Sequence, residues 1–238
     1  MAEPTLLLIH GLGATSGVWA DVVASVDWPG KVVSPDLPGH GAGEWTGDYT
    51  VGALSAGIAA HCENGEEVVV VGHSLGGGVG VCLASNVFRP VVQGVVALGV
   101  KVSWSDADVE GMAGVAAKGV RWCETRDEAV QRFLRNSGLA GIVDPDHPAV
   151  EDAVAEGEGG WRVAQDPMTF AQRKLDMAGL LSAAKCPVIL GAGEHDAMCP
   201  ESDLAVFTDD ARIAPNAGHN VMVEDPSWVR GLIEEISG

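Results

Sequence analysis

The stretch VVVVGHSLGGGVG, Val68 to Gly80, runs from four consecutive valines into a cluster of glycines, with a serine at the junction. Consecutive β-branched residues without polar alternation are typical of a parallel strand that is covered on both faces. Each glycine after Ser74 costs about 1 kcal/mol relative to alanine inside a helix, so their presence indicates close packing against another segment. The stretch therefore predicts a buried strand, a tight turn that carries Ser74, and a helix.

Five other apolar runs resemble this strand in composition. Between most of the runs lie roughly 15 to 25 residues, which is enough for a crossover helix. The pattern predicts an α/β protein with a mostly parallel sheet of about six strands, flanked by helices. The runs are Thr5–Ile9, Lys31–Ser34, Glu67–Gly72, Val91–Gly99, Pro187–Gly193 and Ala211–Pro215.

The interval that follows the fourth run is far longer than one crossover requires, and it predicts an insertion. Thr125 and Glu128 have the spacing of a capping box, which predicts the start of a helix. Asp166 followed by Pro167 is typical of another helix start, and we expect that helix to continue through DPMTFAQRKLDMAGLL. We therefore predict a core of residues 1–101 and 182–238, and a helical cap with its return helix at 102–181.

The charge of the chain limits its partners. In 238 residues, 14 Lys and Arg face 33 Asp and Glu, which leaves a formal net charge of −19. This charge would repel nucleic acids and anionic membranes, so we expect neither as a partner and favour neutral small-molecule ligands. As the origin of the acidity itself we favour a solubility or salt adaptation, because the charges are dispersed. The oligomeric state stays open.

The apolar runs indicate where the protein is located, and the spacing of the cysteines indicates whether it binds a metal. No run approaches the roughly eighteen apolar residues of a membrane span, and the N-terminal MAEPTLLLIHG has no basic region before its apolar stretch, so we predict a cytoplasmic protein. The five cysteines are scattered without CxxC spacing. This predicts reduced thiols, and we expect no metal site and no cofactor.

The segment Gly72 to Gly76 matches the pattern Gly-Xaa-Ser-Xaa-Gly, which places a nucleophilic serine between a strand and a helix. A phosphate-binding turn is the alternative, but GHSLGGG has no Lys-Ser/Thr pair, and Ser74 occupies the middle glycine position of GxGxxG. The earlier GLGATSG is a nearer match to a dinucleotide-binding turn, because Gly11 and Gly13 follow a strand and Asp36 ends the next one. Taken alone, that segment leaves dinucleotide binding open.

Five segments in order resemble the α/β-hydrolase superfamily. They are the His-Gly loop in LLLIHGLGATSGVW, the turn in SPDLPGHGAG, the serine turn itself, the acid-bearing strand end in VILGAGEHDAMCP, and the histidine loop in IAPNAGHNVMVEDP. The resemblance covers residues 6–236 and disfavours the dinucleotide interpretation. It implies the α/β-hydrolase fold with an inserted cap.

A serine hydroxyl needs a base within hydrogen-bond reach, and the base needs a group that orients it. Of seven histidines, only His219 stands in a Gly-His loop after the last strand, which fits the superfamily order of serine, acid and histidine. Glu194 and Asp196 both follow the acid-bearing strand, and the resemblance favours Asp196. It also implies that the backbone amides of Leu12 and Leu75 form an oxyanion hole.

The resemblance predicts a serine hydrolase that cleaves a carboxylic ester, with lactones and thioesters as neighbouring possibilities. Carbon–carbon bond hydrolysis and a cofactor-free perhydrolase or haloperoxidase are alternatives, as is a small-molecule receptor on the same scaffold. Most large apolar side chains of the cap are expected to form its core. Trp161, Met168 and Phe170 are the candidates for substrate contact, because they flank the return of the chain to the sheet.

Overall fold

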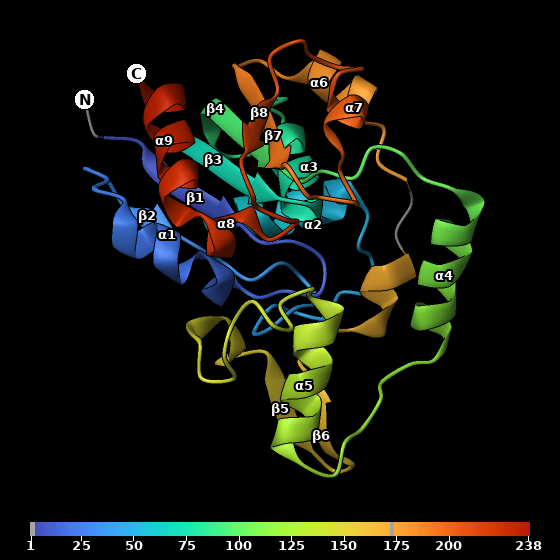
Figure 1. Ribbon diagram of the computed structural model, residues 1–238. Coiled ribbons are helices and arrows are strands. Elements are labelled where there is room, and N and C mark those ends of the chain that lie inside the picture. Colours follow the sequence, from blue (N-terminus) through green and yellow to red (C-terminus); the bar gives the residue numbers. More distant parts are fainter. Residues whose placement is uncertain (1–2, 172–173) are drawn as a thin grey trace.

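The computed structural model describes residues 3–171 and 174–238 (Figure 1). Its centre is a sheet with the strand order β2-β1-β3-β4-β7-β8, in which all neighbouring strands run parallel. The predicted parallel sheet of about six strands is confirmed. The strands are β1 (Thr5–Ile9), β2 (Val32–Val33), β3 (Glu67–His73), β4 (Val91–Leu98), β7 (Val188–Gly193) and β8 (Arg212–Ala214).

Helices cover both faces of this sheet (Figure 1). Side chains of β1 alternate between two buried clusters, Leu6 and Leu8 on one face and Leu7 and Ile9 on the other. Because both faces are buried, the strands carry apolar residues without alternation. One face packs against α1 (Ala20–Ser25), α8 (Val221–Glu224) and α9 (Pro226–Ser237), and the other against α2 (Val51–Ala59), α3 (Leu75–Leu83), α6 (Met177–Ala183) and the short α7 (Glu201–Leu204).

The glycines around Ser74 let α3 approach the sheet. A Cβ on Gly76 would lie 2.2 Å from the carbonyl oxygen of Ile9, and a Cβ on Gly72 would lie 2.2 Å from that of Gly76. Further along α3, a Cβ on Gly80 would lie 3.0 Å from Cγ1 of Val70. These approaches are shorter than van der Waals contact allows, so the turn depends on the absence of side chains.

Beside helices, the insertion contains a two-stranded antiparallel hairpin, which the sequence analysis did not predict. Short glycine-containing strands of mixed polarity carry little periodicity, which is why the hairpin was not predicted. The elements are α4 (Asp106–Ala117), α5 (Arg126–Asn136), β5 (Val154–Gly157), β6 (Gly160–Val163) and the 3₁₀ turns η2 (Pro148–Val150) and η3 (Pro167–Ala171), while η1 (Ser16–Trp19) belongs to the core.

The two helix starts that were predicted in the insertion differ in part from the observed ones. Thr125 accepts a hydrogen bond from the Glu128 amide, but the Glu128 carboxylate accepts from the amide of Glu124, so only half of the predicted capping box forms. The helix expected through DPMTFAQRKLDMAGLL is interrupted. Its first turn, η3, ends at residue 171, residues 172–173 lie outside the described residues, and α6 begins after a cap of its own, where Asp176 accepts from the Gly179 amide.

The insertion packs against the core in two different ways. Phe133 and Leu134 of α5 belong to the same buried cluster as Leu6 and Leu8 of the sheet, so α5 shares the main hydrophobic core. In α4, by contrast, Ala116 is the only buried residue, and the helix lies at the side of the molecule (Figure 1). None of the helices in the described part of the chain has the length and apolar character that a membrane span requires.

We predict that Gly76→Ala lowers the free energy of unfolding by about 1–3 kcal/mol, because the added methyl group overlaps a backbone carbonyl that cannot move alone. Gly111→Ala in α4 is the matched control, since a Cβ there meets nothing within 4 Å and alanine gains about 0.5–1 kcal/mol in a helix. Urea denaturation measures both. A neutral Gly76→Ala would contradict the close approach of α3 to β1.

Candidate active site

Ser74 lies in the turn between β3 and α3, with a φ of 51° and a ψ of −116°. A residue with a side chain rarely adopts this conformation, which costs of the order of 1–3 kcal/mol. Hydrogen bonds hold it in place: the Ser74 amide donates to the Leu98 carbonyl at 2.7 Å, and its carbonyl accepts from the amides of Gly77 and Gly78. The hydroxyl-bearing residue is thus fixed at the end of the sheet where β3 and β4 terminate.

Asp196 and His219 meet in the loops that follow β7 and β8. The Nδ1 atom of His219 lies 2.8 Å from Oδ2 of Asp196, and Oδ1 of Asp196 accepts from the amides of Met198 and Cys199 at 2.8 and 3.1 Å. Burial favours the neutral acid, but the His219 hydrogen bond and charge interaction and the two amides outweigh it, and the pKa of Asp196 is lowered. The ionised carboxylate therefore accepts from Nδ1–H, and Nε2 of His219 is left as an acceptor.

A pocket of about 540 Å³ opens over these residues, and Ser74, His219, Leu12 and Leu75 all line it. Leu12 follows the His-Gly loop after β1, and Leu75 is the first residue of α3. Within the described part of the chain, neither of their amides donates to a protein acceptor. Both donors are thus available beside the serine, as an oxyanion hole would require.

The three cap residues predicted as substrate contacts are separated in the structure. Phe170 lines the pocket, whereas Trp161 and Met168 are absent from its lining among the described residues. Trp161 lies in β6 and exchanges backbone hydrogen bonds with Cys123, and Met168 is 48% exposed on η3. Met168 lies on η3, where the expected helix is interrupted, whereas Trp161 lies in the β5–β6 hairpin, which was not predicted.

Several residues of the pocket were not predicted as substrate contacts. They come from the insertion, from the return segment and from the loop after β7, and no periodicity in the sequence separates them from ordinary core residues. Their apolar side chains contribute to the wall of the pocket. The main examples are Trp104, Met112, Ile142, Leu175 and Met198.

Two residues that sequence analysis missed hold the His219 loop. The carboxylate of Glu224 accepts from the amides on both sides of His219, from Gly218 at 2.8 Å and from Asn220 at 3.1 Å. The side-chain amide of Asn220 donates to the carbonyls of Ser137 and Gly138 at the end of α5. The loop is therefore tied to both the core and the cap. The acidic residue four positions after the Gly-His-Asn sequence was the available signal.

His73 supports the same loop from below. Its Nε2–H donates to the backbone carbonyl of His219 at 2.8 Å, and the two rings lie 4.6 Å apart between centroids. Its Nδ1 atom is buried and has no hydrogen-bond partner among the described residues. Burial lowers the pKa of His73 to about 3, and nearby His219 contributes in the same direction, so the ring is neutral and places no second cation beside His219.

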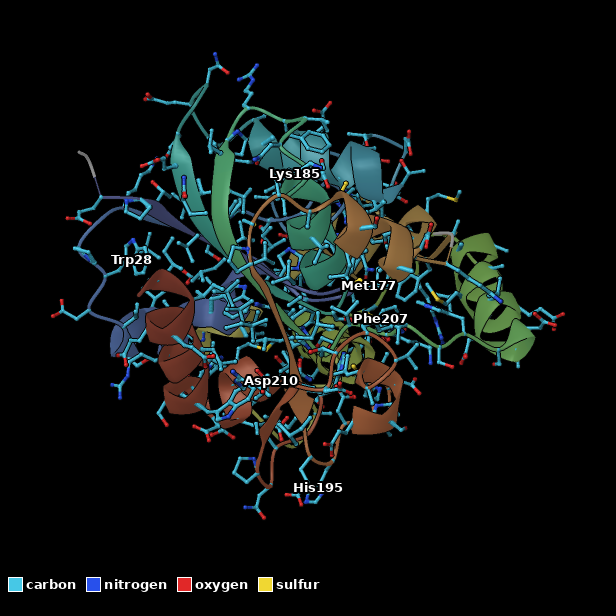
Figure 2. The ribbon with its side chains drawn as sticks, turned by 90° about the horizontal axis from the view of Figure 1, so that it is seen from above. Trp28, Met177, Lys185, His195, Phe207 and Asp210 are labelled. Carbon is cyan, nitrogen blue, oxygen red and sulfur yellow. The ribbon has the colours of Figure 1, made fainter. Side chains whose placement is uncertain are left out.

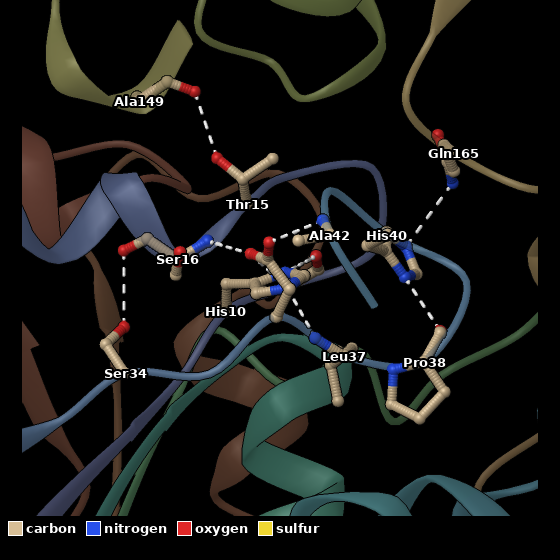
Figure 3. Close-up of polar contacts among 12 residues, drawn as sticks. His10, Thr15, Ser16, Ser34, Leu37, Pro38, His40, Ala42, Ala149 and Gln165 are labelled. Carbon is tan, nitrogen blue, oxygen red and sulfur yellow. Dashed lines mark hydrogen bonds and ion pairs between the residues drawn. The ribbon is translucent and has the colours of Figure 1, made fainter. Parts of the chain in front are cut away.

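His10, Asp36 and His40 form a network in which Oδ1 of Asp36 lies 3.7 Å from Nε2 of His10 and the two imidazole rings lie 5.2 Å apart between centroids. Figure 3 shows the contacts of His10 and His40. The Asp36 carboxylate accepts from the amides of Ser16 and Ala42 at 2.7 and 2.9 Å, which is the structural role expected of an aspartate at a turn. His10 Nε2 accepts from the Leu37 amide at 2.9 Å, so its Nδ1–H donates to the Gly11 carbonyl at 2.8 Å. This network fixes the loop that presents the Leu12 amide.

The remaining histidines either lie away from Ser74, Asp196 and His219 or hold the loops that carry them. His40 contacts Gln165 of the cap at 3.4 Å between side-chain nitrogens. His195 precedes Asp196 in sequence but is exposed and projects outward at the edge of the molecule (Figure 2). His219 is therefore the histidine that both contacts an acid and lines the pocket with Ser74.

Comparison with known proteins gives consistent matches. The family model described as "Alpha/beta hydrolase family" matches residues 6–232. The chain is 31% identical to Lipase LipV of Mycobacterium tuberculosis, over 98% of this chain and 93% of LipV. It is 28% identical to a pimeloyl-[acyl-carrier protein] methyl ester esterase of Neisseria meningitidis, over 84% of this chain and 77% of the esterase.

Solved structures share the fold. E-2-(acetamidomethylene)succinate hydrolase superposes with a TM-score of 0.81 at 21% identity, covering 98% of this chain and 91% of that chain. An esterase from M. tuberculosis superposes with a TM-score of 0.76 at 21% identity, covering 99% and 86%. The fold predicted from the sequence is thereby confirmed.

We predict that the buried neutral histidines make the protein sensitive to acid. Burial lowers the pKa of His40 from 6.5 to about 3, so below pH 6.5 the unfolded chain binds a proton that the native protein does not, and stability falls with pH until about pH 3. When the pH falls from 7.5 to 5.0, the free energy of unfolding of His40→Gln should therefore decrease by about 1–2 kcal/mol less than that of the wild type, as measured by urea denaturation. The exposed His61→Gln is the control and should lose as much as wild type. Equal losses in all three proteins would contradict this account.

Proposed function

The chain belongs to the alpha/beta hydrolase family, and from that premise we propose that it is a serine hydrolase that cleaves a carboxylic ester. The observation that carries the proposal is the 2.8 Å hydrogen bond between Asp196 and His219 beside a pocket that Ser74 also lines. Lipase and esterase relatives support the hydrolase class.

The proposed reaction proceeds through two tetrahedral intermediates. Ser74 Oγ attacks the ester carbonyl carbon while His219 Nε2 takes the hydroxyl proton, and the carbonyl oxygen becomes an oxyanion held by the amides of Leu12 and Leu75. Collapse breaks the ester bond, and the leaving alcohol takes the proton from His219. Water then attacks the acyl-Ser74 carbonyl, with His219 as base again. The products are the carboxylic acid, the alcohol and free Ser74.

In this mechanism Asp196 orients and stabilises His219 and does not contact the substrate. An ionised carboxylate at Nδ1 selects the tautomer whose Nε2 lone pair faces the serine, and it stabilises the imidazolium that forms when the proton is taken. The depressed pKa of Asp196 supports an ionised form at neutral pH. The neutral ring of His73 serves the same end, because a protonated neighbour would oppose charge on His219.

We predict that Ser74→Ala abolishes hydrolysis of a short-chain p-nitrophenyl ester and abolishes covalent labelling by a fluorophosphonate. Ser137→Ala is the matched control, because Ser137 lines the same pocket but its hydroxyl donates to the Phe133 carbonyl inside α5. Mass spectrometry locates the label. Labelling of any serine other than Ser74 would refute the assignment, and a labelled protein without turnover would favour a receptor.

We predict that Asp196→Asn lowers kcat by about 10³–10⁴-fold, because asparagine fixes the wrong tautomer of His219. Glu194→Gln should change kcat by less than about threefold, since Glu194 is exposed and its carboxylate accepts from the Asn216 amide, away from His219. Steady-state kinetics of the two variants decide between the acids. If Glu194→Gln proved the more damaging, the assignment of Asp196 would be wrong.

A further inference from the structure

A second hollow of about 270 Å³ adjoins the active-site pocket inside the cap region. The two cavities share Arg135, Asn136 and Phe170 in their linings, so they are adjacent. The second hollow lies among η3, β6, α5 and the segment that joins α4 to α5, and α5 and β6 run beside each other in the lower part of the molecule (Figure 1).

The charge of this hollow is opposite to that of the whole chain. Among the described residues, five cationic residues and no acidic residue line it, in a protein where acidic residues outnumber basic ones by more than two to one. The cationic residues are Lys118, Arg121, Arg132, Arg135 and Arg162.

These five cations are not neutralised by the protein. Within the described residues, no carboxylate oxygen lies within 4.0 Å of a side-chain nitrogen of any of the five. Arg212, by contrast, pairs with Asp210 and Glu235 on the surface. Because like charges gathered without counter-charges repel one another, the hollow is electrostatically suited to an anion from outside the chain.

Two of the arginines are held by contacts that leave part of each guanidinium free. Arg132 donates through Nη1 to the Arg121 carbonyl at 3.0 Å, which ties α5 to the preceding segment. The Arg162 guanidinium lies 4.6 Å from the centre of the Trp45 ring and donates through Nη1 to the Val163 carbonyl at 3.1 Å. A positioned guanidinium loses less freedom when it binds an anion, and its other donors suit phosphate oxygens.

We propose that this hollow binds a phosphate group on the substrate, so that the enzyme hydrolyses esters with an apolar part on one side and a phosphate monoester on the other. The inference rests on the proposed function and adds the substrate class. A phosphate monoester carries about −1.5 to −2 at neutral pH and offers three strong acceptor oxygens, so it can pair with more of these cations than a single carboxylate can. The apolar wall of Trp104, Met112 and Leu175 receives the uncharged part.

This assignment differs from the neutral ligand that net charge alone favours. At physiological salt the screening length is about 8 Å, so distant carboxylates act weakly on a group inside the hollow, while contacting arginines act fully. Net charge describes the field far from the protein. The local cluster decides what is bound.

The test compares 3-(butyryloxy)propyl phosphate with the neutral 3-hydroxypropyl butyrate as substrates. Lys118→Gln/Arg121→Gln should lower the ratio of kcat/KM for the phosphorylated over the neutral ester by about tenfold, mainly through KM. Both side chains are exposed, so the fold should tolerate the change. Lys185→Gln/Arg126→Gln is the matched control, because it removes the same two charges from exposed positions outside the lining. The ratio should not change in this control.

A binding measurement separates this inference from the proposed function. In the Ser74→Ala background, calorimetric titration with the phosphorylated ester should give a Kd about tenfold weaker for Lys118→Gln/Arg121→Gln than for the control pair. Absence of hydrolysis of both esters, with this difference in Kd retained, would overturn the reaction and leave the phosphate site standing. A ratio or a Kd that changed equally in the control pair, or in neither pair, would overturn the phosphate site.

Discussion

The approach of α3 to the ends of β1 and β3 is the constraint on which the site depends. With no Cβ at Gly72 and Gly76, the helix begins directly above the Ile9 carbonyl, and the single residue between strand and helix is forced to positive φ. The strain at Ser74 is maintained by hydrogen bonds to β4 and to the first turn of α3. Packing of the whole sheet therefore determines where one hydroxyl is presented.

Around this turn, the other groups of the site are supported by residues that hydrogen-bond to backbone atoms beside them. Asp36 and His10 brace the loop that carries Leu12, while Glu224 and His73 brace the backbone of His219. Each support bonds backbone groups and so fixes the position of an amide or a ring without entering the reaction. A site built in this way can vary its pocket wall while the distances among the reacting groups stay constant.

Sequence analysis predicted the parts of the molecule that have a clear local sequence pattern. The six strands were predictable because uninterrupted valine and leucine runs reflect burial on both faces. Asp196 and His219 were singled out by the order of their motifs, and the structure brings them into a hydrogen bond of 2.8 Å. The hairpin of β5 and β6 and the interruption after η3 were not, because short polar segments take their conformation from tertiary packing. Trp161 lies in this hairpin and Met168 lies on η3, and tertiary packing rather than sequence periodicity determines which way their side chains point.

The net charge of the whole chain gave no indication of the charge that surrounds the hollow beside the active-site pocket. The formal charge of −19 averages over carboxylates spread across the surface, whereas the cap collects five of the 14 Lys and Arg around one hollow. Cations that are gathered without carboxylate partners repel one another, so this hollow is suited to an anion from outside the chain. Because Arg135 lines both cavities, an anion held there would lie next to the pocket of Ser74 and would fix the direction in which a substrate enters. The cap thus contributes orientation as well as cover, and it does so through charge rather than through the aromatic residues that the sequence made conspicuous.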